Sequence, residues 1–165
     1  MERKKGTLVS TNTSGISINK LAEERSDDFR KHFCGTHFFN PPRYLPLVEL
    51  IPSTQTDGET ITSLTNFVEK ILGKTAIICK DTPMFIANHI GIYGMMLTME
   101  LMQQCGVTIE EIDALTGKPV GRQKSATFRT CDLVGLDVLG HVADDLSQHV
   151  KEVEEKEMFR MPSFF

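Results

Sequence analysis

The stretch Gly35-Thr36-His37-Phe38-Phe39-Asn40-Pro41-Pro42, followed shortly by Leu47-Val48-Glu49-Leu50-Ile51, decides the fold of this chain. His37 stands where an apolar strand is expected to end, because the two prolines have no backbone N–H to continue strand pairing. Glu49 interrupts a run of aliphatic residues, and burial disfavours an ionised carboxylate that has no partner. We therefore predict that Glu49 pairs with His37 and prepares the imidazole to act as a general base.

The composition is that of a globular protein with one ordinary domain or two small lobes. The chain has 165 residues, of which 40% are hydrophobic and 24% are charged. The formal net charge of −4 and the lack of a dense Lys/Arg stripe argue against a nucleic-acid partner. The most apolar stretch, Met84 to Met99, is shorter than a membrane span, and the basic residues after Met1 precede no apolar segment. We expect a cytoplasmic protein with no membrane contact.

The cysteines give no sign of a metal site or a disulfide scaffold. They are widely spaced and form no C-x-x-C pair: Cys34, Cys79, Cys105 and Cys131. Zinc sites and small disulfide-rich domains both use closer and patterned spacings. We expect reduced, mostly buried thiols and no metal.

The first half of the chain has the pattern of a sheet covered by helices. Short β-branched and apolar runs predict strands over Thr7–Thr11, Phe33–Phe39, Leu47–Ile51 and Thr75–Cys79. Residues 16–22 have loose helical spacing and lead into a charged stretch, residues 23–31. Apolar residues from Ile61 to Leu72 recur at helical spacing, and Gly73 follows them, as expected after a helix end.

The second half reads as all-helical. Pro83 suits the first turn of a helix, and the apolar pattern then runs to Gln104. The residues Thr108-Ile109-Glu110-Glu111 form a capping-box pattern that opens another helix. At least one more helix is expected within Leu133 to Val150, so the change from mixed to helical structure is placed near residue 82.

Four motifs in series carry a family resemblance. They are Asn12-Thr13-Ser14, Gly35 to Pro41, Leu47-Val48-Glu49, and Lys80-Asp81-Thr82-Pro83-Met84-Phe85-Ile86-Ala87-Asn88. With these motifs in this order and spacing, the chain resembles the L-3-hydroxyacyl-CoA dehydrogenases of fatty-acid β-oxidation, roughly from Gly6 to Val142. Gly121 to Asp137 resembles the bacterial branch, in which the dehydrogenase adjoins a hydratase-like region.

The resemblance implies a fold and an activity. The fold is α/β: residues 1–82 form part of an NAD-binding Rossmann-type sheet of about four strands. Residues 83–150 form an all-α C-terminal domain, and residues 151–165 a charged tail. The implied activity is the NAD-dependent oxidation of L-3-hydroxyacyl-CoA to 3-ketoacyl-CoA.

The resemblance also assigns roles to single residues. His37 is the general base for the substrate's 3-hydroxyl, and Glu49 orients the imidazole and balances its charge. Ser14 and Asn88 hydrogen-bond the substrate oxygen. Asn40 and Ser14 lie along the nicotinamide side of NAD. Neutral polar donors suit this task, because they hold an alkoxide-like oxygen without disturbing the base.

The chain departs from the family pattern at three points. The sequence contains no G-x-G-x-x-G turn, the motif whose helix N-terminus binds the pyrophosphate of NAD. We therefore expect a start midway through the dinucleotide fold and weak NAD binding by the isolated chain. Met84 stands where the family commonly has Gly or Asn, and His89 where it usually has Arg. The expected partners are acyl-CoA and either a second copy or a missing N-terminal half.

Purely structural, non-catalytic explanations exist for each of these features. His37 suits a buried structural histidine, Ser14 a capping residue, and Asn88 a core hydrogen bond. The whole chain suits a non-catalytic remnant that binds acyl-CoA or mediates dimerisation. A different NAD-linked hydroxyacid dehydrogenase is a third, weaker alternative, since it is not expected to carry the His-Phe-Phe-Asn-Pro run. The presence of Ser14, His37, Glu49 and Asn88 together favours the enzyme.

Overall fold

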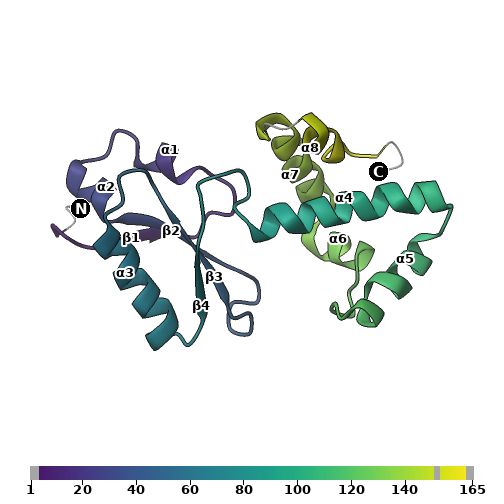
Figure 1. Ribbon diagram of the computed structural model, residues 1–165, viewed down its shortest axis with the longest axis horizontal. Helices are drawn as coiled ribbons and strands as arrows, with labels where there is room; N and C mark the ends of the chain where they lie inside the picture. Colours follow the sequence, from purple (N-terminus) through teal and green to yellow (C-terminus); the bar gives the residue numbers. More distant parts are fainter. Residues whose placement is uncertain (1–3, 151–152, 163–165) are drawn as a thin grey trace. The chain divides into compact units, whose positions relative to one another are not determined.

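The computed structural model describes residues 4–150 and 153–162 and divides into two compact units (Figure 1). The first unit is Met1–Ile86 and the second is Ala87–Phe165. The first contains the sheet, and the helices of the second include the longest helix of the described chain. The domain boundary placed near residue 82 remains a prediction.

The sheet has four strands in the order of the sequence. They are β1 (Val9–Thr11), β2 (Phe33–Phe38), β3 (Leu47–Pro52) and β4 (Thr75–Ile78). β1 is parallel to β2, β2 is antiparallel to β3, and β3 is parallel to β4. The number of strands agrees with the sequence prediction, and each strand ends within two residues of its expected limit.

Helices pack against both faces of the sheet. α1 (Ile18–Ala22) and α2 (Asp27–Lys31) belong with one apolar cluster, while α3 (Gly58–Asn66) and the π-helical turn η1 (Phe67–Ile71) belong with the other. Figure 1 shows α3 running alongside the strands. Within β3, Val48 and Leu50 face the α3 cluster, and Ile51 faces the α1 cluster. Since side chains alternate along a strand, Glu49 lies on the α1 side.

α2 was not predicted, because residues 23–31 lack apolar periodicity. Its start is nevertheless well defined: the Ser26 hydroxyl accepts a hydrogen bond from the Phe29 amide. Phe29 stacks on Phe33 at a ring-centroid distance of 4.8 Å. A capping serine and one stacked aromatic pair therefore hold this short helix in place.

The second unit is helical, as the sequence predicts. Its elements are α4 (Ala87–Cys105), α5 (Ile109–Thr116), the 3-10 turn η2 (Lys118–Val120), α6 (Phe128–Val134), α7 (Leu136–His149) and α8 (Val153–Met158). The predicted capping box is present: Thr108 and Glu111 exchange hydrogen bonds of 2.8 and 3.2 Å. Met96, Met99 and Met102 on α4 are buried.

Two features of the second half differ from the expectation. α4 begins at Ala87 rather than near Pro83, because Met84 and Phe85 have left-handed φ angles of 59° and 55° that no α-helix allows. The stretch set apart as a charged tail includes α8, and Phe159 after it is fully buried. Its ring packs edge-on against His89 and Tyr93.

Within the described ranges, 4–150 and 153–162, no helix combines the length and apolarity needed to cross a bilayer.

Asp81 ties the end of the sheet to the start of α1. Its carboxylate accepts hydrogen bonds from the Ser17 hydroxyl, the Ile18 and Asn19 amides and the Asn19 side chain, at 2.6–2.9 Å. Burial raises the pKa of this carboxyl, but the hydrogen bonds from Asn19, Ile18 and Ser17 together lower the pKa below its usual value. The ionised form is therefore the one that the fold stabilises.

Asp81→Asn is expected to destabilise the first unit by about 1–3 kcal/mol at neutral pH, because charge-assisted bonds to the α1 start are lost. Since the folded pKa is depressed, the wild-type advantage is fully present above the unfolded value of about 3.9 and disappears as pH falls through the folded pKa. Urea unfolding at neutral and acid pH measures this. Asp57→Asn is the control, because Asp57 precedes α3 without a side-chain capping bond. A pH-independent difference would contradict the assignment.

Candidate functional site

His37 and Glu49 form a buried pair at the centre of the first unit. They stand directly opposite each other in the β2–β3 ladder, and His37 Nδ1 lies 2.7 Å from Glu49 Oε2. Only 3% of His37 and 1% of Glu49 is exposed. An ionised carboxylate can only accept, so Nδ1 carries the proton in that pairing and Nε2 is left to accept another. The contact expected from sequence is present.

The residues around this pair fix both groups. The second oxygen of Glu49, Oε1, accepts a hydrogen bond of 3.1 Å from the Ile86 amide. The rings of Phe39 and Phe85 approach the imidazole edge-on, with centroid distances of 4.6 and 5.6 Å. The imidazole is thus oriented by a held carboxylate and shielded by aromatic side chains.

Cys79 is a buried thiol beside Glu49. Its amide donates to the Leu50 carbonyl at 2.8 Å, just beyond β4. Burial, together with the charge of Glu49 and a hydrogen bond to it, raises the pKa of Cys79 to about 12. Cys79 is therefore a neutral thiol at physiological pH and adds no second charge to the pair.

Ser14 and Asn40 lie at the carboxyl ends of two parallel strands. The turn Asn12–Gly15 follows β1 and the Phe39–Asn40 segment follows β2; the Phe38 amide donates to Asn12 Oδ1 at 2.8 Å and joins them. Both Ser14 and Asn40 are exposed. Carboxyl ends of parallel strands are where open α/β sheets bind ligands. These two neutral side chains therefore stand at an edge suited to a ligand.

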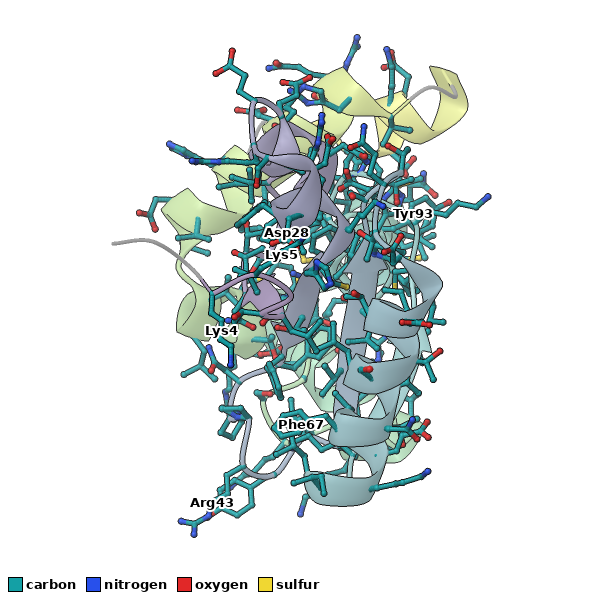
Figure 2. The ribbon with its side chains drawn as sticks, turned by 90° about the vertical axis from the view of Figure 1, so that its left-hand side faces the viewer. Lys4, Lys5, Asp28, Arg43, Phe67 and Tyr93 are labelled. Atoms are coloured by element: carbon teal, nitrogen blue, oxygen red, sulfur yellow. The ribbon has the colours of Figure 1, made fainter. Side chains whose placement is uncertain are left out.

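Lys74 holds the base of the loop that follows Asn40. The Lys74 ammonium donates to the carbonyls of Pro42 and Leu45 at 2.5 and 2.7 Å. Figure 2 shows Arg43 at the tip of this loop, with its side chain directed away from the sheet. Lys74 thus stabilises the base of the loop.

Asn88 belongs to the second unit. It is the second residue of α4 and is half-buried. Its predicted contact with the substrate oxygen remains a prediction, as do the roles assigned to Ser14, His37, Asn40 and Glu49.

The chemistry open to this site is proton transfer by an oriented imidazole. Throughout the described residues, no three His, Cys, Asp or Glu side chains gather as a metal ion would need. Sequence reasoning did not find Phe85, the Ile86 amide or Cys79 as neighbours of the pair. The only signal was their place in or beside the Lys80–Asn88 motif.

Both halves of the chain match models of one protein family. Residues 2–82 match the NAD binding domain of 3-hydroxyacyl-CoA dehydrogenase, and residues 85–164 match its C-terminal domain. The chain belongs to the 3-hydroxyacyl-CoA dehydrogenase family. The resemblance and the fold class inferred from sequence are therefore confirmed: a Rossmann-type mixed sheet followed by a helical domain.

Curated relatives extend beyond this chain. Over 162 residues the chain is 53% identical to a probable 3-hydroxyacyl-CoA dehydrogenase of Bacillus subtilis, covering 98% of the chain and 20% of that protein. It is 48% identical over 143 residues to a protein of the same description from Deinococcus radiodurans, covering 87% and 41%. The chain thus spans less than half the length of either relative.

Solved structures share the fold. FadB2 of Mycobacterium tuberculosis superimposes with a TM-score of 0.83 at 28% identity, covering 98% of this chain and 54% of that one. The (S)-3-hydroxybutyryl-CoA dehydrogenase PaaH1 of Ralstonia eutropha gives 0.78 at 30% identity, covering 93% and 51%.

Proposed function

We propose that this chain carries the proton-transfer and substrate-binding part of an NAD-dependent 3-hydroxyacyl-CoA dehydrogenase of fatty-acid β-oxidation. The observation that carries the proposal is the buried His37–Glu49 pair, with a 2.7 Å hydrogen bond, at the end of β2. Burying an ionisable pair costs free energy that only excellent geometry and hydrogen bonds offset, so such a pair is weak evidence of a purely stabilising role. Membership of the dehydrogenase family supplies a task.

The residues present fit one end of NAD. The edge formed by the Asn12–Gly15 turn and the Phe39–Asn40 segment offers the neutral donors and acceptors of Ser14 and Asn40, which suit the carboxamide-bearing nicotinamide ring. The sequence has no G-x-G-x-x-G turn for the pyrophosphate. When bound, NAD accepts the hydride from C3 of the substrate.

The protein's own part in the reaction is the movement and storage of one proton. In the oxidative direction, His37 Nε2 accepts the proton of the 3-hydroxyl, while Nδ1–H remains bonded to Glu49 Oε2. The Glu49 carboxylate balances the resulting imidazolium and is itself kept in place by the Ile86 amide. Phe39 and Phe85 limit the access of water to the ring. Ser14 and Asn88 are proposed to hold the substrate oxygen.

The alternative is a non-catalytic remnant that binds acyl-CoA or mediates dimerisation. The intact buried pair favours the enzyme, because an acyl-CoA groove or a dimer surface needs no oriented imidazole.

Association with another polypeptide is part of the same proposal. Four apolar side chains at the end of α6 and the start of α7 are exposed on the second unit: Leu133, Val134, Leu136 and Val138. Apolar side chains gathered on a surface are typical of interaction sites. A second copy of the chain would be a suitable partner.

Calorimetric titration tests the proposal directly. We expect acetoacetyl-CoA to bind the purified 165-residue chain, and NADH to bind more weakly than that ester, since these residues contain no G-x-G-x-x-G turn for the pyrophosphate. Ser14→Ala is the matched variant, because Ser14 is exposed and its loss leaves the core unchanged; it should weaken acetoacetyl-CoA binding. A chain that binds neither ligand at millimolar concentration would favour the remnant.

A further inference from the structure

The segment Met84–Ile86 has an unfavourable backbone for its sequence. Met84 and Phe85 are consecutive non-glycine residues with φ angles of 59° and 55°. L-amino acids with a Cβ disfavour this left-handed region, whereas Gly and Asn enter it readily. Strained backbone of this kind persists only where the surrounding structure holds it in place.

Each residue of this segment reaches a different part of the site. The Phe85 ring packs edge-on against the His37 imidazole, and the Ile86 amide donates to Glu49. The Met84 side chain packs against Gly15: a β-carbon at Gly15 would lie 2.8 Å from Met84 Cε and 3.1 Å from Sδ. The thioether thus fills the space beside the residue that follows Ser14.

The turn that carries Ser14 has hydrogen bonds on either side of that residue. Asn12 Oδ1 accepts from the Phe38 amide, and the Thr13 hydroxyl accepts from the Ile16 amide at 3.1 Å. The Met84 thioether covers Gly15, which lies between these tethers. It supplies an apolar contact from a segment far away in the sequence.

We propose that Met84 is a positioning residue for Ser14, an inference that rests on the proposed function. Its thioether presses on Gly15 and keeps the Asn12–Gly15 turn in the conformation that aims Ser14 at the substrate oxygen. The same strained segment places the Phe85 ring against His37 and the Ile86 amide against Glu49. One stretch of chain therefore positions both the Asn12–Gly15 turn and the proposed general base.

Two substitutions separate the side chain from the backbone. Met84→Asn introduces a residue that tolerates positive φ and removes the thioether. Met84→Leu keeps apolar bulk and the backbone strain. Amide hydrogen exchange of Ile16 reports the turn through its bond to Thr13, and Ile18, whose amide donates to Asp81, is the internal reference.

We expect Met84→Asn to raise the Ile16 exchange rate about tenfold, from the loss of apolar contact, and to leave Ile18 unchanged. Its melting temperature should not fall, since backbone strain is relieved. Met84→Leu should stay within about twofold of the wild type for Ile16. In the acetoacetyl-CoA titration, affinity should fall about fivefold in the Asn variant only. An unchanged Ile16 rate in Met84→Asn would overturn the proposal, as would an equal rise at Ile16 and Ile18.

Gly15→Ala probes the same contact from the other side. With Met84 present, the new methyl must displace the thioether and should accelerate Ile16 exchange. In the Met84→Asn background the same change should have little further effect, which is the non-additivity expected of residues in contact. Additive effects would overturn the inference. These exchange measurements need no ligand, so a wild-type chain that fails to bind acetoacetyl-CoA would count against the proposed function separately.

Discussion

Replacing His37 with Asn is expected to lower NADH-dependent reduction of acetoacetyl-CoA by roughly 100- to 10,000-fold while preserving the fold. In the mechanism that we propose, the His37 imidazolium donates the proton in this direction of the reaction. The amide N–H of Asn lies near the position of Nδ1 and still donates to Glu49, so the buried carboxylate keeps a partner. The amide cannot carry a proton to substrate. Initial rates at saturating ligand, with circular dichroism to confirm folding, measure this.

Two further variants serve as a control for activity and a comparison for stability. His32→Asn changes a half-buried histidine that pairs with Asp28, away from the site, and should leave the rate within about twofold. His37→Ala should destabilise the first unit by about 3–5 kcal/mol, because the Glu49 charge loses its paired donor. If His37→Asn retained more than a tenth of the wild-type rate, the imidazole would not be the proton carrier.

Glu49→Gln is expected to reduce the same rate by about 100-fold or more with a small loss of stability. Gln has nearly the same shape, and its carbonyl oxygen still accepts from the Ile86 amide or from His37 Nδ1. It carries no negative charge, so the imidazolium that forms during the reaction is not balanced. Initial rates of the wild type and the variant measure the loss of activity, and thermal unfolding of both measures the loss of stability.

Glu69→Gln is the matched control for this substitution, because Glu69 is an exposed carboxylate on η1. It should change neither the rate nor the melting temperature. A Glu49→Gln rate close to that of the wild type would show that Glu49 only fills space in the core.

Sequence reasoning reached the His37–Glu49 pair because a strand pattern is readable locally. Pro41 and Pro42 end β2, and a charge inside the apolar run of β3 demanded a partner. Once both stretches are assigned as strands, only their pairing register remains to be determined, and the burial of one face of the sheet restricts that register. His37 and Glu49 are only 12 residues apart, which favours pairing between the two neighbouring strands that carry them.

The surroundings of the pair were beyond reach because they depend on long-range packing. Nothing local to Ile86 indicates that its amide binds a carboxylate 37 residues earlier. Met84 and Phe85 look like the start of a helix from Pro83, yet their left-handed backbone delays α4 to Ala87. The contact between Met84 and Gly15 likewise appears only in three dimensions.

The helices show the same difference between local signals, which the sequence reveals, and long-range packing, which it does not. The Thr108–Glu111 capping box is a local device and was predicted correctly. α2 has the local signals of Ser26 followed by two aspartates, but its short charged sequence gave no apolar periodicity to find. The residues assigned to a tail contain α8, whose stability depends on burying Phe159 against distant rings.

In the proposed mechanism, His37 donates Nδ1–H to Glu49 and keeps Nε2 free to accept the substrate proton. The most direct test is a long-range proton–nitrogen NMR spectrum of the imidazole ring in the purified chain, with Glu49→Gln beside it. We expect neutral His37 to be protonated at Nδ1 in the wild type, and the preference for that tautomer to be weaker in the variant. A wild-type ring protonated at Nε2, or a spectrum unchanged by Glu49→Gln, would contradict it.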